Sequence, residues 1–213
     1  EETPVFLAMK ADAALEAGLP LTRVLRDHRA QIWPSMLLTG FLSVGIVTLT
    51  LLTPSILQTQ FSYPASDALE ANSIAIICLT FGCIFWGWLA DRIGAYRVLL
   101  LGSLALAASS YVFYHALPAE VGHTTLLYSI AGFCLGSVAV VPMILVGLFP
   151  PAVRYSGFSF SYNVAYSIFG GFAPMLVAYW LKSDVLAPAH LLAIVCVFAV
   201  AMAVYLPLKE KRP

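Results

Sequence analysis

The sequence predicts an all-α membrane protein with six transmembrane helices, and three observations support this fold class. Hydrophobic residues make up 61% of the chain and charged residues 10%, against roughly 45–50% and 25% in a soluble domain. Six continuous apolar runs each have the roughly 20 residues that a helix needs to cross a bilayer. Strands of a membrane barrel would instead alternate in polarity over about ten residues. Finally, the basic residues sort to one side of the membrane.

The six predicted spans cover residues 31–57, 69–90, 97–117, 124–148, 158–181 and 187–207. Their ends are marked by residues that are polar or that stop a helix: Asp67 and Glu70 before the second span, Pro118, Glu120 and Gly122 after the third, Pro150 and Pro151 after the fourth, and Lys182 to Pro188 between the last two. We therefore divide the chain into a polar segment over 1–29, a six-helix bundle over 30–208 and a short tail over 209–213.

The basic residues predict the orientation of this bundle. One side of the predicted topology holds Lys10, Arg23, Arg26, Arg29, Arg92, Arg97, Arg154, Lys209, Lys211 and Arg212. The opposite loops hold only Lys182. By the positive-inside rule, both termini and the loops 87–97 and 149–157 lie in the cytoplasm. The loss or gain of one span would scramble this sorting, so it also supports the count of six.

Residues 1–29 differ in kind from the rest of the chain. They are polar overall, with an amphipathic stretch around Val5, Phe6, Met9 and Leu15 that is suited to lie along the inner membrane surface. We expect no signal peptide, because the segment lacks a basic start followed by an apolar core.

Several function classes are disfavoured by composition. A formal net charge of zero argues against a nucleic-acid partner, which needs clustered lysine and arginine. The four cysteines lie in apolar runs without a C-x-x-C pair or a histidine at metal-ligand spacing, so they read as packing residues. We see no arrangement of nucleophile, base and orienting group, and no phosphate-binding loop. We therefore expect no enzyme activity, no cofactor and no metal site.

The segment Gly87-Trp88-Leu89-Ala90-Asp91-Arg92-Ile93-Gly94-Ala95-Tyr96-Arg97 is the most informative motif. It is a short charged turn between two apolar runs that are each long enough to cross a bilayer. As G-x-x-x-D-R-x-G-x-x-R it resembles the signature loop of the major facilitator superfamily. The resemblance implies a secondary transporter, in which this loop acts as a conformational latch.

The physical reading of this loop has two alternatives. Gly94 can adopt a positive φ where the chain reverses. Asp91 can accept a hydrogen bond from Arg97, or from backbone N–H groups at the positive end of the next helix. Such a charged latch would hold one conformation and release in another. Alternatively, Arg92 and Arg97 are ordinary positive-inside residues and Asp91 is a helix cap.

A second stretch supports a particular subfamily. Residues 149–157 resemble the P-x-x-x-R-x-x-G turn between the tenth and eleventh helices of the superfamily, with Arg154 and Gly157 at the motif positions. Arg154 either locks an inner gate or anchors the loop at the lipid headgroups. Residues 157–163 and 168–174 together resemble the eleventh helix of the metabolite:proton symporters, the transporters of α-ketoglutarate, shikimate, citrate and proline or betaine. Residues 1–6 resemble the region just after the sixth helix of that family.

The resemblance implies that the chain is the carboxy-terminal half of a twelve-helix facilitator fold, built as two three-helix repeats. Its partner would be an amino-terminal six-helix half or a second copy, in a bacterial inner membrane. The implied activity is proton-coupled symport of a small organic acid, zwitterion or osmolyte by alternating access. The alternative is a non-transporting six-helix module that associates with itself or with a separate half.

The resemblance also indicates which spans line the substrate pathway. In this superfamily the first helix of each repeat faces the central cavity, which here means 31–57 and 124–148, joined by part of 158–181. The candidate pathway residues are Thr39, Ser43 and Thr50 on one helical face, Tyr128 on the fourth span, and Tyr162, Asn163 and Tyr166 on the fifth. The competing interpretation is that such hydroxyls bind their own backbone carbonyls.

Two further features bear on mechanism. No acidic or basic residue falls in the centre of a span, so a proton carrier would have to come from the absent amino-terminal half. Pro54, Pro142 and Pro174 can kink their helices. Gly132 and Gly136 form a G-x-x-x-G pair that is suited to close helix contacts.

Overall fold

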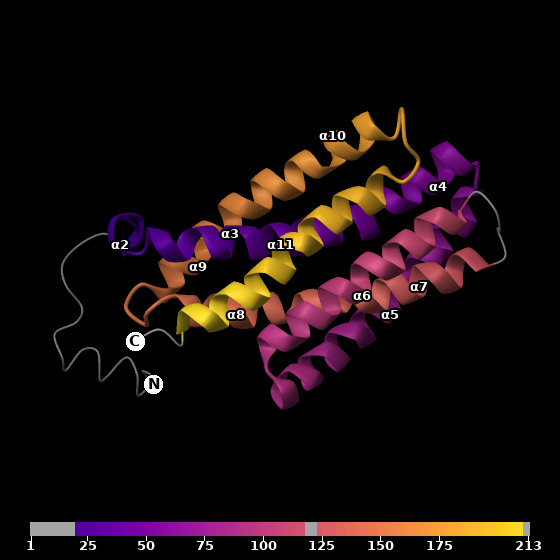
Figure 1. Cartoon of the computed structure of the whole chain (residues 1–213). Coiled ribbons are helices and arrows are strands. Elements are labelled where there is room, and N and C mark those ends of the chain that lie inside the picture. The colour runs from indigo at the N-terminus through magenta and orange to yellow at the C-terminus, as the bar shows by residue number, and fades with distance from the viewer. Residues whose placement is uncertain (1–19, 118–122, 211–213) are drawn as a thin grey trace, which may run out of the picture.

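The computed structural model describes residues 20–117 and 123–210, and every regular element in these ranges is a helix. The helices run side by side along one bundle (Figure 1). In this described part, five helices are long and apolar enough to cross a membrane: Arg29–Phe61, Ala65–Ile93, Ala95–Ala116, Thr124–Leu148 and Ala187–Leu208. The protein is thus an all-α, multi-pass membrane protein.

The first half of the bundle begins with α2 (Pro20–Asp27), followed by α3 (Arg29–Ile46), a π-helical segment η1 (Val47–Leu52) and α4 (Thr53–Phe61). Two long helices follow, α5 (Ala65–Ile93) and α6 (Ala95–Ala116). They are joined at Gly94, whose φ of 93° lies in the region that glycine adopts without a side-chain clash. The helix ends differ from the predicted span ends by a few residues.

The second half contains α7 (Thr124–Leu135), a 3₁₀ segment η3 (Gly136–Ala139) and α8 (Val140–Leu148). After a turn come α9 (Arg154–Ala165), a π-helical segment η4 (Tyr166–Gly170) and α10 (Gly171–Trp180), and the last helix is α11 (Ala187–Glu210). The predicted amphipathic stretch around Val5 to Leu15 lies outside the described residues, as does the end of the tail.

The predicted fifth span, 158–181, is the one that differs from a simple apolar helix. It consists of three successive pieces, α9, η4 and α10, and it is not among the five helices that meet the length and hydropathy needed for a span. The reason is its composition, because serine, tyrosine and asparagine side chains dilute the apolar residues of α9. The count of six spans therefore stays a prediction for this segment.

The contacts between helices repeat in the two halves. In the first arrangement, α5 packs along α7, and α6 packs on both α7 and α11. In the second, α9 packs along α3, and α11 packs on both α3 and α6. Exchanging α3 for α7–α8, α5 for α9–α10, and α6 for α11 converts the first set of contacts into the second. Such an exchange is what two three-helix repeats related by an internal two-fold would produce.

A close crossing joins α5 to α7 and η3 through glycines. A Cβ atom added at Gly82 would lie 2.3 Å from the carbonyl oxygen of Phe133, and one added at Gly136 would lie 2.4 Å from the carbonyl carbon of Gly82. The indole N–H of Trp86 donates to the same Phe133 carbonyl at 3.1 Å. The predicted role of Gly132 and Gly136 in close helix contact is therefore confirmed, and the contact lies within the chain.

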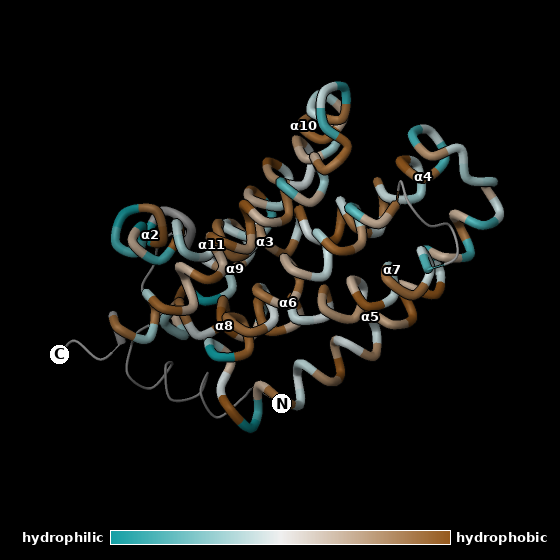
Figure 2. Tube along the Cα trace, turned by 45° about the vertical axis from the view of Figure 1, so that its right-hand side comes forward, coloured by the Kyte–Doolittle hydropathy of each residue, from teal (hydrophilic) through white to brown (hydrophobic). Residues whose placement is uncertain are grey.

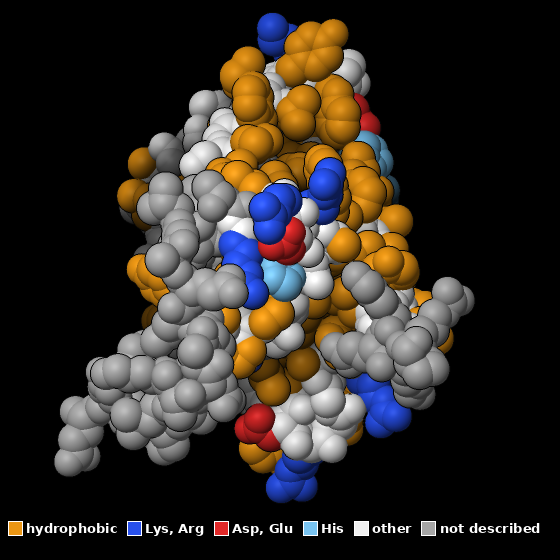
Figure 3. Space-filling model, turned by 90° about the vertical axis from the view of Figure 1, so that its left-hand side faces the viewer, with side chains coloured by type: hydrophobic (Ala, Val, Ile, Leu, Met, Phe, Trp, Pro, Cys, Tyr) orange, Lys and Arg blue, Asp and Glu red, His pale blue; other side chains and the backbone are white. Residues whose placement is uncertain are grey.

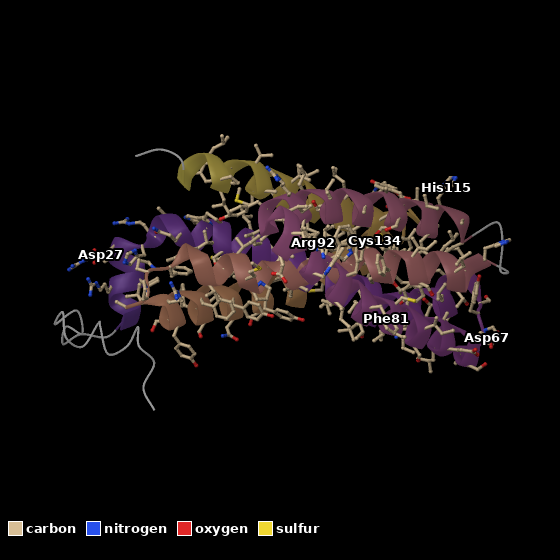
Figure 4. All side chains as sticks on the ribbon, turned by 90° about the horizontal axis from the view of Figure 1, so that it is seen from below. Asp27, Asp67, Phe81, Arg92, His115 and Cys134 are labelled. Carbon is tan, nitrogen blue, oxygen red and sulfur yellow. The ribbon has the colours of Figure 1, made fainter. Side chains whose placement is uncertain are left out.

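Charged and hydrophilic residues lie mainly at the two ends of the bundle (Figure 2). In Figure 1 the helix α2 and the α8–α9 turn lie toward the left, the α5–α6 turn lies at the bottom near the middle, and the α4–α5 and α10–α11 turns lie toward the right. Figure 3 looks onto the left-hand end, where lysine and arginine side chains gather. Figure 4 places Asp27 at that end, Asp67 and His115 at the opposite end, and Arg92 between them. The α5–α6 turn is therefore set back from α2.

The α10–α11 turn is held by a short chain of hydrogen bonds. The backbone N–H of Leu186 donates to one carboxylate oxygen of Asp184 at 2.8 Å, and the imidazole of His190 bonds the other at 2.8 Å. The second ring nitrogen of His190 bonds the hydroxyl of Tyr111 on α6 at 2.7 Å. The Leu186 N–H and the His190 ring both favour the charged carboxylate, so they lower the pKa of Asp184 below its ordinary value.

This lowered pKa predicts a pH-dependent contribution to stability. A carboxyl group with a depressed folded-state pKa stabilises the protein above the ordinary aspartate value of about 3.9, and this contribution is lost as the pH falls through the lowered value. We expect Asp184→Asn to lower the thermal unfolding temperature at pH 7, and the difference from wild type to shrink below about pH 4. Unfolding of both proteins in detergent between pH 3 and 7 measures this; a pH-independent difference would contradict it.

Candidate functional site

In this structure Asp91 is not bonded to the arginines of the loop between α5 and α6. Arg97, in the first turn of α6, donates to the carbonyl of Ile93 at 3.5 Å, and the guanidinium of Arg92 lies 4.4 Å from the ring centroid of Trp88. Asp91 is exposed. It makes no hydrogen bond or ion pair with any residue that the structure describes, and α6 has no side-chain cap. The expected bond from Asp91 to Arg97 or to the start of α6 is therefore not formed in this conformation.

The two glycines of the loop serve different purposes. Gly94 allows the positive φ of the turn, as predicted. Gly87 stands in helical backbone, and a Cβ added there would meet nothing within 4 Å. Within the described part of this chain, then, nothing requires position 87 to be small. Its small size matters only if another helix, outside the described residues, approaches α5 at this point.

The turn after α8 is built around a buried aromatic ring. Phe149 packs with Val24, Ile32 and Val153 in a small cluster beneath α2. A Cβ added at Gly157 would lie 2.4 Å from the Phe149 ring, so the glycine makes room for it. The guanidinium of Arg154 donates to the Phe149 carbonyl at 3.2 Å. In this conformation Arg154 thus closes its own turn, and it forms no ion pair with a described carboxylate.

The hydroxyls predicted to line a pathway on the first span are occupied by their own helix. Thr39 donates to the Ser35 carbonyl at 2.9 Å, and Ser43 donates to the Gly40 carbonyl at 3.3 Å. Thr50 donates to the Ile46 carbonyl at 2.7 Å. Thr39 and Ser43 are fully buried, because α3 is covered by α9, η4 and α11. Neither of the two cavities described below is lined by these three side chains.

Tyr128 lies in a buried polar network rather than on an open surface. Its hydroxyl donates to the carbonyl of Leu49 and also contacts the side-chain amide of Asn72. A phenol has one hydrogen, so we assign the Asn72 amide with its NH₂ group toward Tyr128. Leu49 lies in η1, whose π-helical turns shift the usual backbone bonding and expose a carbonyl. Tyr128 satisfies that carbonyl across the bundle.

A neighbouring pair of residues, Thr53 and Tyr114, satisfies another carbonyl of η1. The sequence alone did not indicate this pair. The hydroxyl of Thr53 donates to the Thr48 carbonyl at 2.9 Å. The Thr53 oxygen lies 2.6 Å from the hydroxyl of Tyr114 on α6. Because the Thr53 hydrogen is used for Thr48, Tyr114 is the donor of this second bond. Asn72, an amide inside an apolar span, was the one sequence signal that could have indicated this network.

The network predicts a measurable effect on stability. We expect Tyr128→Phe to lower the free energy of unfolding by about 1–3 kcal/mol, since the Leu49 carbonyl and the Asn72 amide both lose a buried partner. Tyr179→Phe is the matched control, because Tyr179 is 70% exposed on α10. Denaturant unfolding of both variants in detergent tests this. Equal stabilities of the two variants would show that the hydroxyl of Tyr128 does not support η1.

The predicted residues of the fifth span form an exposed polar face on α9 and η4. The rings of Phe158 and Tyr162 are stacked with centroids 5.4 Å apart, and those of Tyr162 and Tyr166 are 5.7 Å apart. Asn163 is exposed, and its NH₂ group donates to the Ser159 carbonyl at 2.8 Å. Within the described part of the chain, neither Tyr162 nor Tyr166 makes a hydrogen bond through its hydroxyl. These are the predicted pathway residues that remain available to a ligand.

Two cavities flank α10. One, of about 470 Å³, lies between α4 and α10 and is lined in part by Ser55, Gln60 and Lys182. The other, of about 360 Å³, lies between α3, α10 and α11 and is lined almost wholly by apolar side chains. Only Ala173 and Val177 of α10 are buried. The helix after η4 is therefore loosely packed on both sides.

Among the described residues, no group of three or more histidine, cysteine, aspartate or glutamate side chains could hold a metal ion. The four cysteines are free. The polar groups gathered on α9 are hydroxyls and one amide, which suit a small polar solute better than a cation that needs charged ligands.

Comparison with known proteins decides the family. The sequence profile of the Major Facilitator Superfamily matches residues 8–174, which is most of the chain. The chain belongs to this superfamily. The match includes the α5–α6 loop, the α8–α9 turn and the polar face of α9.

The curated relatives are transporters. A Staphylococcus aureus (strain COL) protein assigned as a proline/betaine transporter is 29% identical over 213 aligned positions, covering 98% of this chain and 46% of the relative. An ectoine/proline transporter of Corynebacterium glutamicum is 25% identical, covering 78% and 33%. The shikimate transporter of Escherichia coli K12 is 37% identical over 105 residues, covering 47% and 23%. This facilitator chain thus spans about half the length of the first of these relatives.

Proposed function

We propose that this facilitator chain is the carboxy-terminal half of a secondary transporter that moves a small polar organic solute by alternating access. The observation that carries the proposal is the polar face of α9 and η4, in a chain that belongs to a transporter superfamily and spans half of its transporter relatives. Hydroxyls and amides without partners are costly against hydrocarbon. The face therefore fits against a water-filled cavity shared with a second half.

The loop between α5 and α6 supports the same proposal. Asp91 is exposed and bonds to no described residue. No described atom lies close enough to Gly87 to require a glycine there. Both features are accounted for if a helix of the amino-terminal half approaches the end of α5 in one state of the transport cycle. Asp91 would then bind the positive N-terminal end or a basic residue of that half, and the bond would break in the other state.

Proton coupling forms part of the proposal and depends on residues outside this chain. The spans of this half hold no acidic or basic residue at their centres, and such residues are the usual proton carriers. We therefore place the proton-carrying residue in the amino-terminal half. The sorted basic residues support an orientation with both termini in the cytoplasm, and we place the protein in a bacterial inner membrane.

Uptake by the complete protein tests the proposal. Purified full-length protein in proteoliposomes should accumulate at least one solute from a panel of proline, betaine, ectoine, shikimate and α-ketoglutarate. An imposed inward proton gradient should increase the accumulation, and a protonophore should abolish that increase. Failure to take up every solute under all conditions would contradict transport, and gradient-independent uptake would contradict proton coupling only.

The rival function is a six-helix module that does not transport. The measurement that distinguishes it from a transporter half is the mass of the solubilised chain, with and without co-expressed upstream sequence. The proposal expects this chain to co-purify with the upstream six-helix region. A chain that stays monomeric in the presence of the upstream region, or that associates only with further copies of itself, would favour the non-transporting module.

A further inference from the structure

Three of the aromatic residues of α9 and η4 form a ladder at every fourth position. Phe158, Tyr162 and Tyr166 follow one another along a single helical face, with successive centroids 5.4 and 5.7 Å apart. All three residues are half-buried, so part of each side chain remains accessible. Asn163 lies three residues before Tyr166 and is therefore its neighbour on the helix surface.

The charge of this segment limits what the ladder can bind. Residues 155–181 contain no lysine, arginine, histidine, aspartate or glutamate. Arg154, in the first turn of α9, is the one charged side chain on α9 and α10, and it donates to the Phe149 carbonyl. Beyond it, a purely anionic solute would find no cationic partner on residues 155–181, and a cationic solute would find no carboxylate. The attraction that the segment does offer is the negative face of aromatic rings, which binds ammonium and quaternary ammonium groups.

A zwitterion suits such a surface better than a free ion. Its own carboxylate balances its ammonium group, so neither half of the transporter has to bury an uncompensated charge. The side-chain amide of Asn163 and the two tyrosine hydroxyls can hydrogen-bond the polar end of the solute. Proline, betaine and ectoine, the solutes named for two of the relatives, all combine a positively charged nitrogen group with a carboxylate.

We propose that the ladder of Tyr162 and Tyr166 binds the positively charged nitrogen group of a zwitterionic solute through the faces of the rings, with Asn163 as a hydrogen-bonding neighbour. This inference rests on the proposed transport function and narrows its substrate class. A cation placed over a tyrosine ring within about 6 Å of its centroid gains roughly 0.5–2 kcal/mol, more when water is excluded.

An isosteric pair of ligands tests the proposal directly. Betaine and 3,3-dimethylbutyrate have the same shape and the same carboxylate, but only betaine carries a positive charge on its branched end. Each is measured as an inhibitor of uptake by the full-length transporter, whose solute is taken from the panel above. We expect betaine to bind the wild-type protein at least tenfold more tightly than dimethylbutyrate.

The variants separate the ring face from the hydroxyl group. Tyr162→Phe and Tyr166→Phe keep the ring, so betaine binding should change less than threefold. The double variant Tyr162→Leu with Tyr166→Leu removes both rings, so betaine binding should weaken at least tenfold while dimethylbutyrate binding stays unchanged. Tyr155→Leu is the control on the same helix, because Tyr155 is 84% exposed and lies outside the ladder. Size-exclusion profiles confirm that each variant remains folded.

Three results would overturn the inference. Equal binding of betaine and dimethylbutyrate by the wild type would show that charge is not recognised. Equal losses in the phenylalanine and leucine variants would assign the binding to the hydroxyls, and equal loss of both ligands in the double leucine variant would indicate a change of shape alone. In each case uptake of any panel solute would leave the proposed transport function intact, so the two failures are distinguishable.

Discussion

Gly82→Ala should prevent stable assembly of the bundle. The added Cβ would lie 2.3 Å from the carbonyl oxygen of Phe133 and 3.0 Å from its carbonyl carbon. Backbone atoms cannot rotate away as a flexible side chain would, so α5 must separate from α7. Overpacking in a well-packed core costs roughly 1–3 kcal/mol and occasionally more, and the Trp86 bond to the same carbonyl is strained as well. We expect a loss at or above the top of that range.

The matched control for this variant is Gly147→Ala on α8. That glycine is also helical, but a Cβ added there would meet nothing within 4 Å. Thermal unfolding and size-exclusion chromatography in detergent compare the two proteins. Gly82→Ala should give little folded protein, or an unfolding temperature well below that of Gly147→Ala. Similar profiles for the two variants would show that the α5–α7 crossing relaxes at little cost.

Asp91→Asn should slow transport by at least tenfold and leave the apparent affinity for the solute within about twofold. The substitution keeps the size of the side chain and removes its charge. The free energy of a charge-assisted hydrogen bond is about 1.5–3 kcal/mol, which corresponds to a factor of roughly ten or more in rate. Because Asp91 has no described partner in this half, the fold of the half should be unaffected. Initial rates of uptake by the full-length protein measure both quantities.

Asp27→Asn is the control for this second substitution. Asp27 is also an exposed acid, and among the described residues it is paired only with its neighbour Arg26 at 2.9 Å. Exposed pairs of this kind contribute little, so transport should be unchanged. A normal turnover in Asp91→Asn, or equal slowing in both variants, would contradict a latch at Asp91. A raised apparent KM with normal turnover would place Asp91 in solute binding instead.

Much of the bundle was predictable because length and polarity are local properties of the sequence. An apolar run of about 20 residues can satisfy its backbone in a bilayer only as a helix, so five of the spans follow directly. The turn at Gly94 was predictable for the same reason, since the glycine falls between two such runs. The polar segment over α9 was predicted as a span, but its tyrosines and Asn163 weaken the hydropathy signal that defines one.

The roles of single polar residues were less predictable. Thr39 and Ser43 share a helical face, which favoured a pathway, yet in the folded chain they are covered by α9, η4 and α11 and bind their own carbonyls. Tyr128 was also assigned to the pathway, but it supports the π-helical turn at Leu49. A small hydroxyl looks the same in sequence whether it faces a cavity or a neighbouring helix, so the assignment of these residues to a pathway stays a prediction.

By itself, the sequence determined the class of the protein, the approximate ends of its helices, and the positions of its charged loops and of the polar segment over α9. Only the tertiary structure decided how each helix is rotated and which residues meet, such as Gly82 with Phe133 or Tyr128 with Leu49. The physical reason is the solvent. In a bilayer the outer face of a helix is as apolar as its packed face, so no hydrophobic stripe records which side turns inward, and only packed contacts distinguish the two.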